Sequence, residues 1–165
     1  ATMPNDTQIV ALSGSGELKA WNRSTGQATF VAYNASQPTC SPDGQYVGFS
    51  DGESFYLVSL ATGELSGKIP DTGDVRAAAF HPNSPKLALL SLHKGGYYLF
   101  TTNLQNGQVD APFPVPVISA YLRWFGDRYV LLDNHKLVDT QQRVVAWSYN
   151  LPAGNHVPVS PDDRH

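Results

Sequence analysis

The stretch from Cys40 to Gly52, CSPDGQYVGFSDG, contains two turn signals and a short apolar run. Pro42, Asp43 and Gly44 favour a tight reversal, because proline presets φ, aspartate caps its own turn and glycine accepts a positive φ. The run YVGF that follows is typical of a β-strand, and Asp51-Gly52 then predicts a hairpin turn. The segment therefore predicts a strand bounded by two reversals, and it raises the question of whether this unit recurs.

Two sequence markers recur along the chain. The SPDG-type turn is repeated as FHPNS from Phe80 and VSPDD from Val159, and a copy without proline, WFGD, begins at Trp124. A second marker occurs at residues 21–26, 58–63, 102–107 and 138–143, beginning with WNRSTG. Both markers recur about every 40 residues, a period that together with β-prone segments predicts propeller blades of about four strands each.

The segments between the markers read as strands. Second strands are expected at residues 9–12, 46–49, 87–90 and 129–132, and third strands are expected to end near Trp21, Val58, Thr102 and Val138. These runs are almost continuously apolar, which predicts sheets that are packed on both faces. We therefore expect an all-β chain of β-propeller-type repeats, with about four blades of four antiparallel strands, which could form part of a larger ring.

The run SPDG-x-Y-V-G-F-S and the ending W-N-x-x-T-G resemble the repeats of WD-repeat-like β-propellers, and the SPDG form is similar to divergent bacterial repeats such as the Tol-system propeller. The resemblance covers nearly the whole chain and implies a scaffold that binds a protein or peptide partner. The chain departs from the family at the aspartate of the Trp-Asp signature, where Asn22, Ser59, Asn103 and Asp139 stand, and it lacks the Gly-His pair. The family's hydrogen-bonded tetrad is therefore expected to be absent or replaced.

The expected organisation is a single propeller domain or segment over residues 1–165. Its blade units are 7–36 plus 155–162, 37–70, 74–113 and 117–150. Because the two ends are complementary parts of one blade, we expect Val157–Ser160 to pair with the strand at Ile9–Leu12. Three readings stay open: a small ring closed by one chain, a larger ring completed by a second copy in a homodimer, or an excerpt of a longer chain.

Composition restricts the classes of partner. The net charge is −3 and the 11 lysines and arginines are dispersed, so no nucleic-acid partner is expected. The chain contains no apolar run of about 18 residues, so no membrane span is expected, and no secretion signal is visible; the sequence leaves the compartment undetermined. Cys40 is the single cysteine, which excludes an internal disulfide, and its slot in the repeat predicts a core position.

Polar side chains gather in the turns that join second to third strands, which the family topology places on one rim of the ring. The candidate binding residues are Asp51, Glu53, His93, Lys94, Asp133 and His135. Carboxylates and imidazoles can bind a divalent metal, as in lactonase-type propellers, but turns are also polar simply because they face water. We predict no metal site and no cofactor, and regard this rim as a surface for a protein or peptide.

No catalytic motif is found in the sequence, and no catalytic residue is predicted. His81 is expected to make a local hydrogen bond in its turn, and Trp147 on an outermost strand could anchor a partner. The sequence therefore predicts a non-catalytic interaction scaffold. The alternative is a propeller enzyme, either a metal-dependent lactonase-like hydrolase or the propeller part of a serine peptidase whose catalytic domain lies elsewhere.

Overall fold

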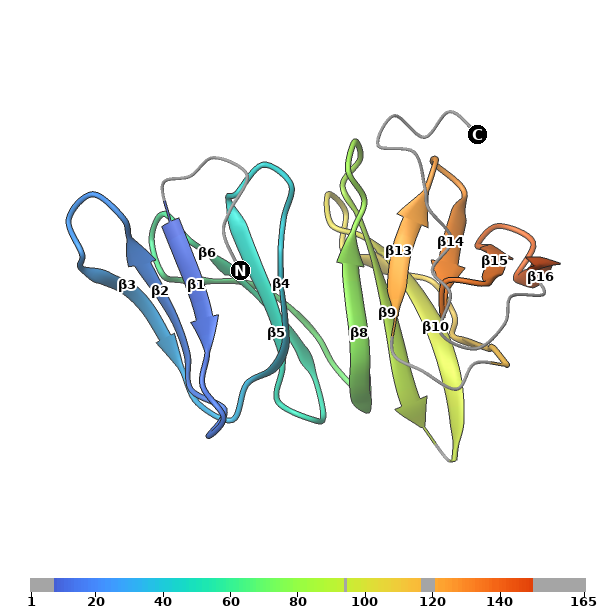
Figure 1. The fold of residues 1–165 in the computed structure, drawn as a ribbon, viewed down its shortest axis with the longest axis horizontal. Coiled ribbons are helices and arrows are strands. Elements are labelled where there is room, and N and C mark those ends of the chain that lie inside the picture. Colours follow the sequence, from blue (N-terminus) through green and yellow to red (C-terminus); the bar gives the residue numbers. More distant parts are fainter. Residues whose placement is uncertain (1–7, 94, 117–120, 150–165) are drawn as a thin grey trace.

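The computed structural model describes residues 8–93, 95–116 and 121–149, and these residues form four antiparallel sheets (Figure 1). The first sheet holds β1 (Gln8–Leu12), β2 (Leu18–Asn22) and β3 (Ala28–Ala32). The second holds β4 (Ser36–Cys40), β5 (Tyr46–Ser50), β6 (Phe55–Ser59) and β7 (Leu65–Ile69). The third holds β8 (Asp74–Phe80), β9 (Lys86–His93), β10 (Gly96–Asn103) and β11 (Gln108–Val109), with β12 (Phe113–Pro114) also paired to β10. The fourth holds β13 (Leu122–Phe125), β14 (Tyr129–Leu132), β15 (Lys136–Asp139) and β16 (Val144–Ser148).

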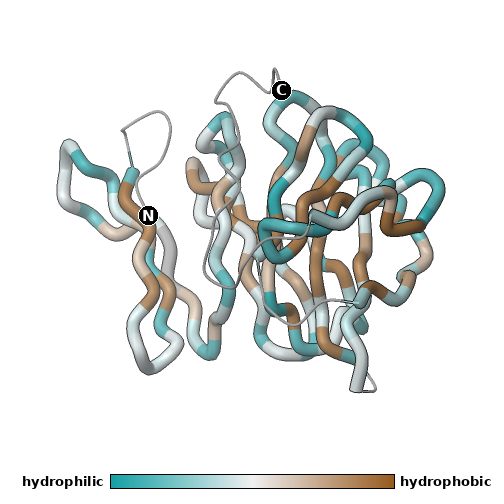
Figure 2. Tube along the Cα trace, turned by 45° about the vertical axis from the view of Figure 1, so that its right-hand side comes forward, coloured by the Kyte–Doolittle hydropathy of each residue, from teal (hydrophilic) through white to brown (hydrophobic). Residues whose placement is uncertain are grey.

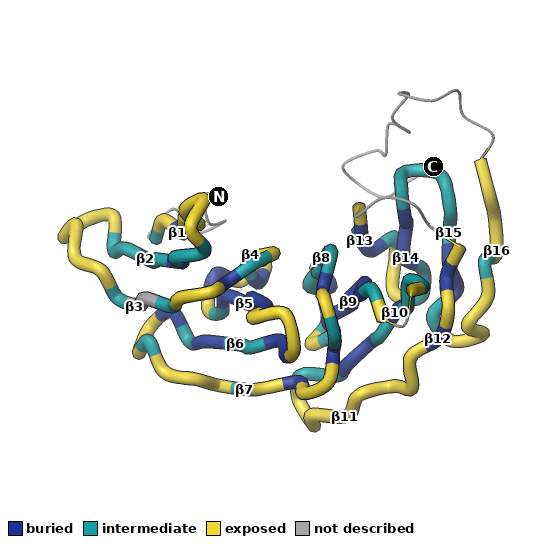
Figure 3. The backbone as a smooth tube through the Cα atoms, turned by 90° about the horizontal axis from the view of Figure 1, so that it is seen from below, coloured by how far each residue is buried: buried dark blue, intermediate teal, exposed yellow. Residues whose placement is uncertain are grey.

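The sheets stand side by side in an open arc, which Figure 3 shows from below. Strands β1, β4, β8 and β13 line the inner side of the arc, and β3, β7, β11 and β16 lie along its outer side. Apart from β12, which pairs with β10, the neighbouring strands of each sheet follow one another in the chain as a meander. This confirms the expected all-β fold with propeller-type sheets. The described part of the chain contains no helix long and apolar enough to cross a membrane.

The core lies between the sheets, and three apolar clusters fill it. Val10 and Ala20 of the first sheet pack with Val47 and Val58 of the second. Phe55 and Ile69 of the second sheet pack with Val75, Leu87 and Leu89 of the third, and Ala88, Leu90 and Leu99 of the third pack with Trp124, Val130 and Val138 of the fourth. Neighbouring residues of β9 thus face opposite sides, which explains why the strand sequences are continuously apolar. Figure 2 shows apolar residues along the strands and hydrophilic residues at the turns.

The second sequence marker is one turn, which joins β2 to β3, β6 to β7, β10 to β11 and β15 to β16. In every copy a residue with positive φ donates its backbone N–H to the carbonyl four residues earlier; these residues are Gly26, Gly63, Gly107 and Arg143. Three of them are glycine, for which a positive φ carries no steric cost, whereas Arg143 adopts a φ of 58°. The last position of this turn therefore requires a positive φ, and in the fourth sheet Arg143 adopts it at a steric cost.

Cys40 is expected at a core position. It is half-buried at the end of β4, where it packs against the cluster between the first and second sheets, and burial raises the pKa of its thiol. A raised pKa keeps the thiol protonated and unreactive, which fits a packing role.

The segment 155–162 lies outside the described residues, so the assigned blade units and the pairing of Val157–Ser160 with β1 stay predictions.

Candidate functional site

The structure places the predicted rim residues in the turns between second and third strands. Asp51 and Glu53 lie in the β5–β6 turn, His93 ends β9, and Asp133 and His135 lie in the β14–β15 turn; Lys94 is outside the described residues. The β1–β2, β5–β6 and β9–β10 turns lie together at the lower edge of the molecule in Figure 1. Three of the turns thus share one edge, and that the predicted residues form one binding rim stays a prediction.

Asp51 organises its own turn. Its Oδ1 accepts hydrogen bonds from the backbone N–H groups of Glu53 and Ser54, each at 2.9 Å, and its Oδ2 accepts one from the Tyr56 hydroxyl at 2.8 Å. Partial desolvation acts to raise the pKa of the Asp51 carboxyl, but these hydrogen bonds outweigh it and the pKa is lowered. Both carboxylate oxygens therefore serve the turn.

The histidines of the rim also have local contacts. His135 Nδ1 lies 2.8 Å from the carbonyl oxygen of Asp133, and the His135 carbonyl accepts the Tyr149 N–H. The ring of His93 meets the ring of Tyr98 edge-on, with 6.1 Å between centroids. Within residues 8–93, 95–116 and 121–149, no three His, Cys, Asp or Glu side chains are grouped as metal ligands would be. The rim residues described here are therefore dispersed over separate turns.

A concave site lies between the second and third sheets, on the face opposite the turns that join second to third strands. It is a groove of about 660 Å³, called here the inter-sheet groove. The turns β4–β5 and β8–β9, which form much of it, lie at the upper edge of Figure 1. Its lining residues are Ser41, Pro42, Asp43, Tyr46, Leu57, Ser66, Phe80, His81, Pro82, Asn83, Ser84, Pro85, Leu104 and Gln105.

The inter-sheet groove combines apolar side chains with one carboxylate. Leu57, Phe80 and Leu104 are half-buried and pack against the cluster between the two sheets. Asp43 is exposed, and its Oδ1 accepts hydrogen bonds from the Ser41 hydroxyl and from the Gln45 N–H. None of the described residues that line the groove is a lysine or arginine. The groove therefore offers apolar contact area beside a negative charge.

His81 holds one wall of the groove in place. It occupies the place of Ser41 in the repeat, is 2% exposed, and accepts the Asn83 N–H at Nδ1 over 3.0 Å. Because Nδ1 accepts, the proton of the neutral ring lies on Nε2, which is 3.2 Å from the Gly126 carbonyl and can donate to it. The local hydrogen bond expected from the sequence is present, and a second one ties the turn to the fourth sheet.

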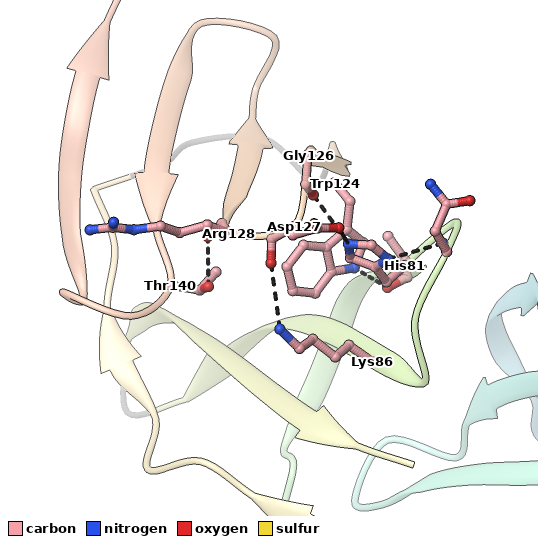
Figure 4. Close-up of polar contacts among 9 residues, drawn as sticks. His81, Lys86, Trp124, Gly126, Asp127, Arg128 and Thr140 are labelled. Atoms are coloured by element: carbon pink, nitrogen blue, oxygen red, sulfur yellow. Dashed lines mark hydrogen bonds and ion pairs between the residues drawn. The ribbon is translucent and has the colours of Figure 1, made fainter. Parts of the chain in front are cut away.

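The contacts around His81 form a seam between the third and fourth sheets (Figure 4). Trp124 Nε1 donates to the Ala79 carbonyl at 3.0 Å, and the Trp124 ring meets the His81 ring edge-on with 4.9 Å between centroids. Lys86 Nζ donates to the Asp127 carbonyl at 3.4 Å. These contacts hold the β8–β9 turn from the side opposite the groove.

The aspartate position of the repeat has a local role here. Asn22, Asn103 and Asp139 each accept backbone N–H groups of their own turn through Oδ1. Asp139 is 1% exposed and its Oδ2 pairs with Arg128. The hydrogen bond from Arg128, joined by those from the turn, lowers the Asp139 pKa to about 2. These side chains thus cap turns, in line with the expected replacement of the family's tetrad.

Comparison with known structures places this arc within a larger architecture. The sequence matches no family model and no curated protein sequence. The β-propeller domain of Cps50 (Swd1) from Myceliophteria thermophila superposes with a TM-score of 0.67 at 14% identity, covering 92% of this chain and 54% of that one. U3-55K superposes with a TM-score of 0.67 at 13% identity, covering 87% and 49%. The arc of sheets therefore has the fold of part of a β-propeller. The chain spans about half the length of these two structures.

The inter-sheet groove was not predicted from the sequence. The sequence indicates its two proline-containing turns only as repeat markers, with a structural role for their residues. The signal was the loss of repetition within the markers: Asp43 and Asn83 stand at equivalent positions but differ in charge. Trp147, predicted as an anchor on an outermost strand, lies on β16 and is 62% exposed.

Proposed function

We propose that this chain is a non-catalytic propeller scaffold that binds a protein or peptide segment in the inter-sheet groove. The observation that carries the proposal is the composition of the groove, with Leu57, Phe80 and Leu104 half-buried beside the exposed carboxylate of Asp43. Ligand sites in proteins are typically concave and largely apolar, with a few polar groups that fix orientation. Charge complementarity therefore points to a segment that presents an apolar side chain next to a lysine or arginine.

The groove is suited to binding because its walls are fixed before a partner arrives. The Ser41 hydroxyl closes one turn by donating a hydrogen bond to Asp43, and His81 anchors the other turn to the fourth sheet. A preformed site loses less conformational entropy on binding than a flexible one. Most of the affinity would come from the apolar contact, since an exposed ion pair contributes only about 0–1 kcal/mol.

The experiment is panning of short random peptides on the purified chain, followed by affinity measurements with one enriched synthetic peptide. Enriched sequences should pair an aliphatic or aromatic residue with a lysine or arginine. Asp43→Asn should weaken binding roughly threefold, with a smaller effect at high salt, because asparagine keeps the Oδ1 acceptor and removes the charge. Leu104→Ala should weaken it roughly tenfold or more.

Glu53→Gln is the matched control, because Glu53 is an exposed carboxylate on the opposite face. It should bind the peptide as the unchanged chain does. The proposal would be wrong if no peptide family is enriched, or if Asp43→Asn and Leu104→Ala bind as tightly as this control. Loss of binding in Glu53→Gln alone would instead favour the rim of second-to-third strand turns.

The enzyme alternatives gain no comparable support. A lactonase-like hydrolase needs carboxylates or imidazoles around one metal ion, and the described rim residues lie in separate turns. The serine peptidase reading concerns a catalytic domain outside this chain.

The SPDG turn supports a narrower proposal, that the chain belongs with the divergent bacterial repeats similar to the Tol-system propeller. Homologues found only outside bacteria would contradict that assignment.

A further inference from the structure

The strand register shows which side of each sheet faces its predecessor. The second and third strands pair Val47 with Val58, Leu87 with Thr102, and Val130 with Val138. In all three sheets the residue of the second strand packs into the cluster shared with the preceding sheet. These six side chains are between 0% and 4% exposed. This pair of positions therefore defines the backward face of a sheet, which is buried wherever a preceding sheet exists.

The first sheet has the same backward face without a described sheet against it. Its register pairs Ile9 with Trp21 at the positions equivalent to Val47 and Val58. Ile9 is 39% exposed and Trp21 is half-buried, although both are large apolar residues. Val10 and Ala20, the next pair, point the other way into the cluster with the second sheet and are buried. The first sheet is thus patterned for burial on both sides.

The fourth sheet carries the complementary forward face. Leu131 pairs with Leu137 at the positions equivalent to Val10 and Ala20, and Leu137 pairs with Trp147 of β16. Leu131 is buried, Leu137 is half-buried and Trp147 is 62% exposed. The two faces stand at opposite ends of the open arc (Figures 1 and 3). A forward face meeting a backward face is the same contact that the molecule makes three times internally.

We propose that two copies of this chain combine head to tail, each setting the forward face of its fourth sheet against the backward face of the other's first sheet. A second copy fits these faces because the same forward and backward positions already meet between each pair of neighbouring sheets in the molecule. Two such contacts related by a two-fold axis close a ring and leave no end face open. The proposal is independent of the inter-sheet groove and of its ligand.

The test is the mass in solution of the 165-residue chain by light scattering over a range of concentrations. A mass of about twice 17.9 kDa is expected. A single-chain mass at all concentrations, or an assembly of more than two copies, would overturn the proposal. Ile9→Lys and Trp147→Glu should each weaken dimerisation roughly tenfold or more, since each puts a charge into an apolar contact.

Leu65→Glu is the matched control, because Leu65 is 60% exposed on β7, away from both end faces. It should dimerise normally, and circular dichroism should be unchanged in all three variants. Mixing Ile9→Lys with Trp147→Glu should restore dimers, because a head-to-tail pair then retains one unaltered contact. Failure of the mixture to form dimers, or normal dimerisation of Ile9→Lys, would also overturn the proposal.

Discussion

Gly48 lies at the centre of the segment that first indicated the repeat, and its substitution by alanine tests how the second and third sheets pack. A Cβ at this position would lie 2.6 Å from both Cε1 and Cζ of the Phe55 ring. Phe55 is fully buried among Ile69, Val75, Leu87 and Leu89, so its ring has no free space to enter. The equivalent position holds a larger residue in the other sheets, so a glycine is required here by packing and not by the strand.

The expected magnitude combines two opposing effects. Overpacking a well-filled core costs about 1–3 kcal/mol, whereas replacing a strand glycine by alanine recovers about 0.5–1 kcal/mol of chain entropy. Gly48→Ala should therefore lower the free energy of unfolding by about 1–2 kcal/mol. Urea unfolding followed by tryptophan fluorescence, at one fixed protein concentration, measures this change.

Two further variants identify the cause. Gly67→Ala on β7 is the matched control, because its Cβ would meet Leu57 Cδ1 at an ordinary 3.6 Å, and its stability should be unchanged or slightly higher. Phe55→Leu replaces the clashing ring by a shorter aliphatic side chain. In that background Gly48→Ala should lower the free energy of unfolding only slightly, which gives a coupling energy of about 1–2 kcal/mol. A cost for Gly48→Ala below about 0.5 kcal/mol, or no coupling to Phe55→Leu, would refute the packing argument.

Three other predictions concern turns and the seam between the third and fourth sheets. Arg143→Gly should raise the free energy of unfolding by about 1 kcal/mol in urea titrations, because Arg143 has a φ of 58°. The lowered pKa of Asp139, caused first by its hydrogen bond from Arg128, stabilises the fold above pH 3.8, and this contribution should be lost as the pH falls toward about 2. Asp139→Asn should remove that part of the pH dependence in acid titrations followed by circular dichroism. His81→Ala should cost about 1–3 kcal/mol in thermal unfolding, because it removes the buried partner of Gly126 and the ring packed on Trp124.

The strand pattern and the turns could be predicted from the sequence because both depend on neighbouring residues. Pro42, Asp43 and Gly44 favour a reversal locally, and YVGF favours a strand through its own β-prone residues. The left-handed turn at Gly26 recurs in each sheet for the same reason, and Arg143 shows that the repeat position, and not glycine alone, fixes the backbone there. The period of the markers then led to propeller-type sheets, which the structure confirms.

The position of the inter-sheet groove depends on tertiary packing and does not follow from the sequence alone. Leu57, Phe80 and Leu104 are far apart in the chain and meet because the second and third sheets stand face to face. The same packing decides that Gly48 must remain glycine, since Phe55 fills the space of its side chain. Ile9 and Val47 occupy equivalent positions in the repeat, yet one is exposed and the other is buried. Local sequence sets the direction in which each side chain points, and the presence or absence of a neighbouring sheet decides whether that direction leads into the core or to an open face.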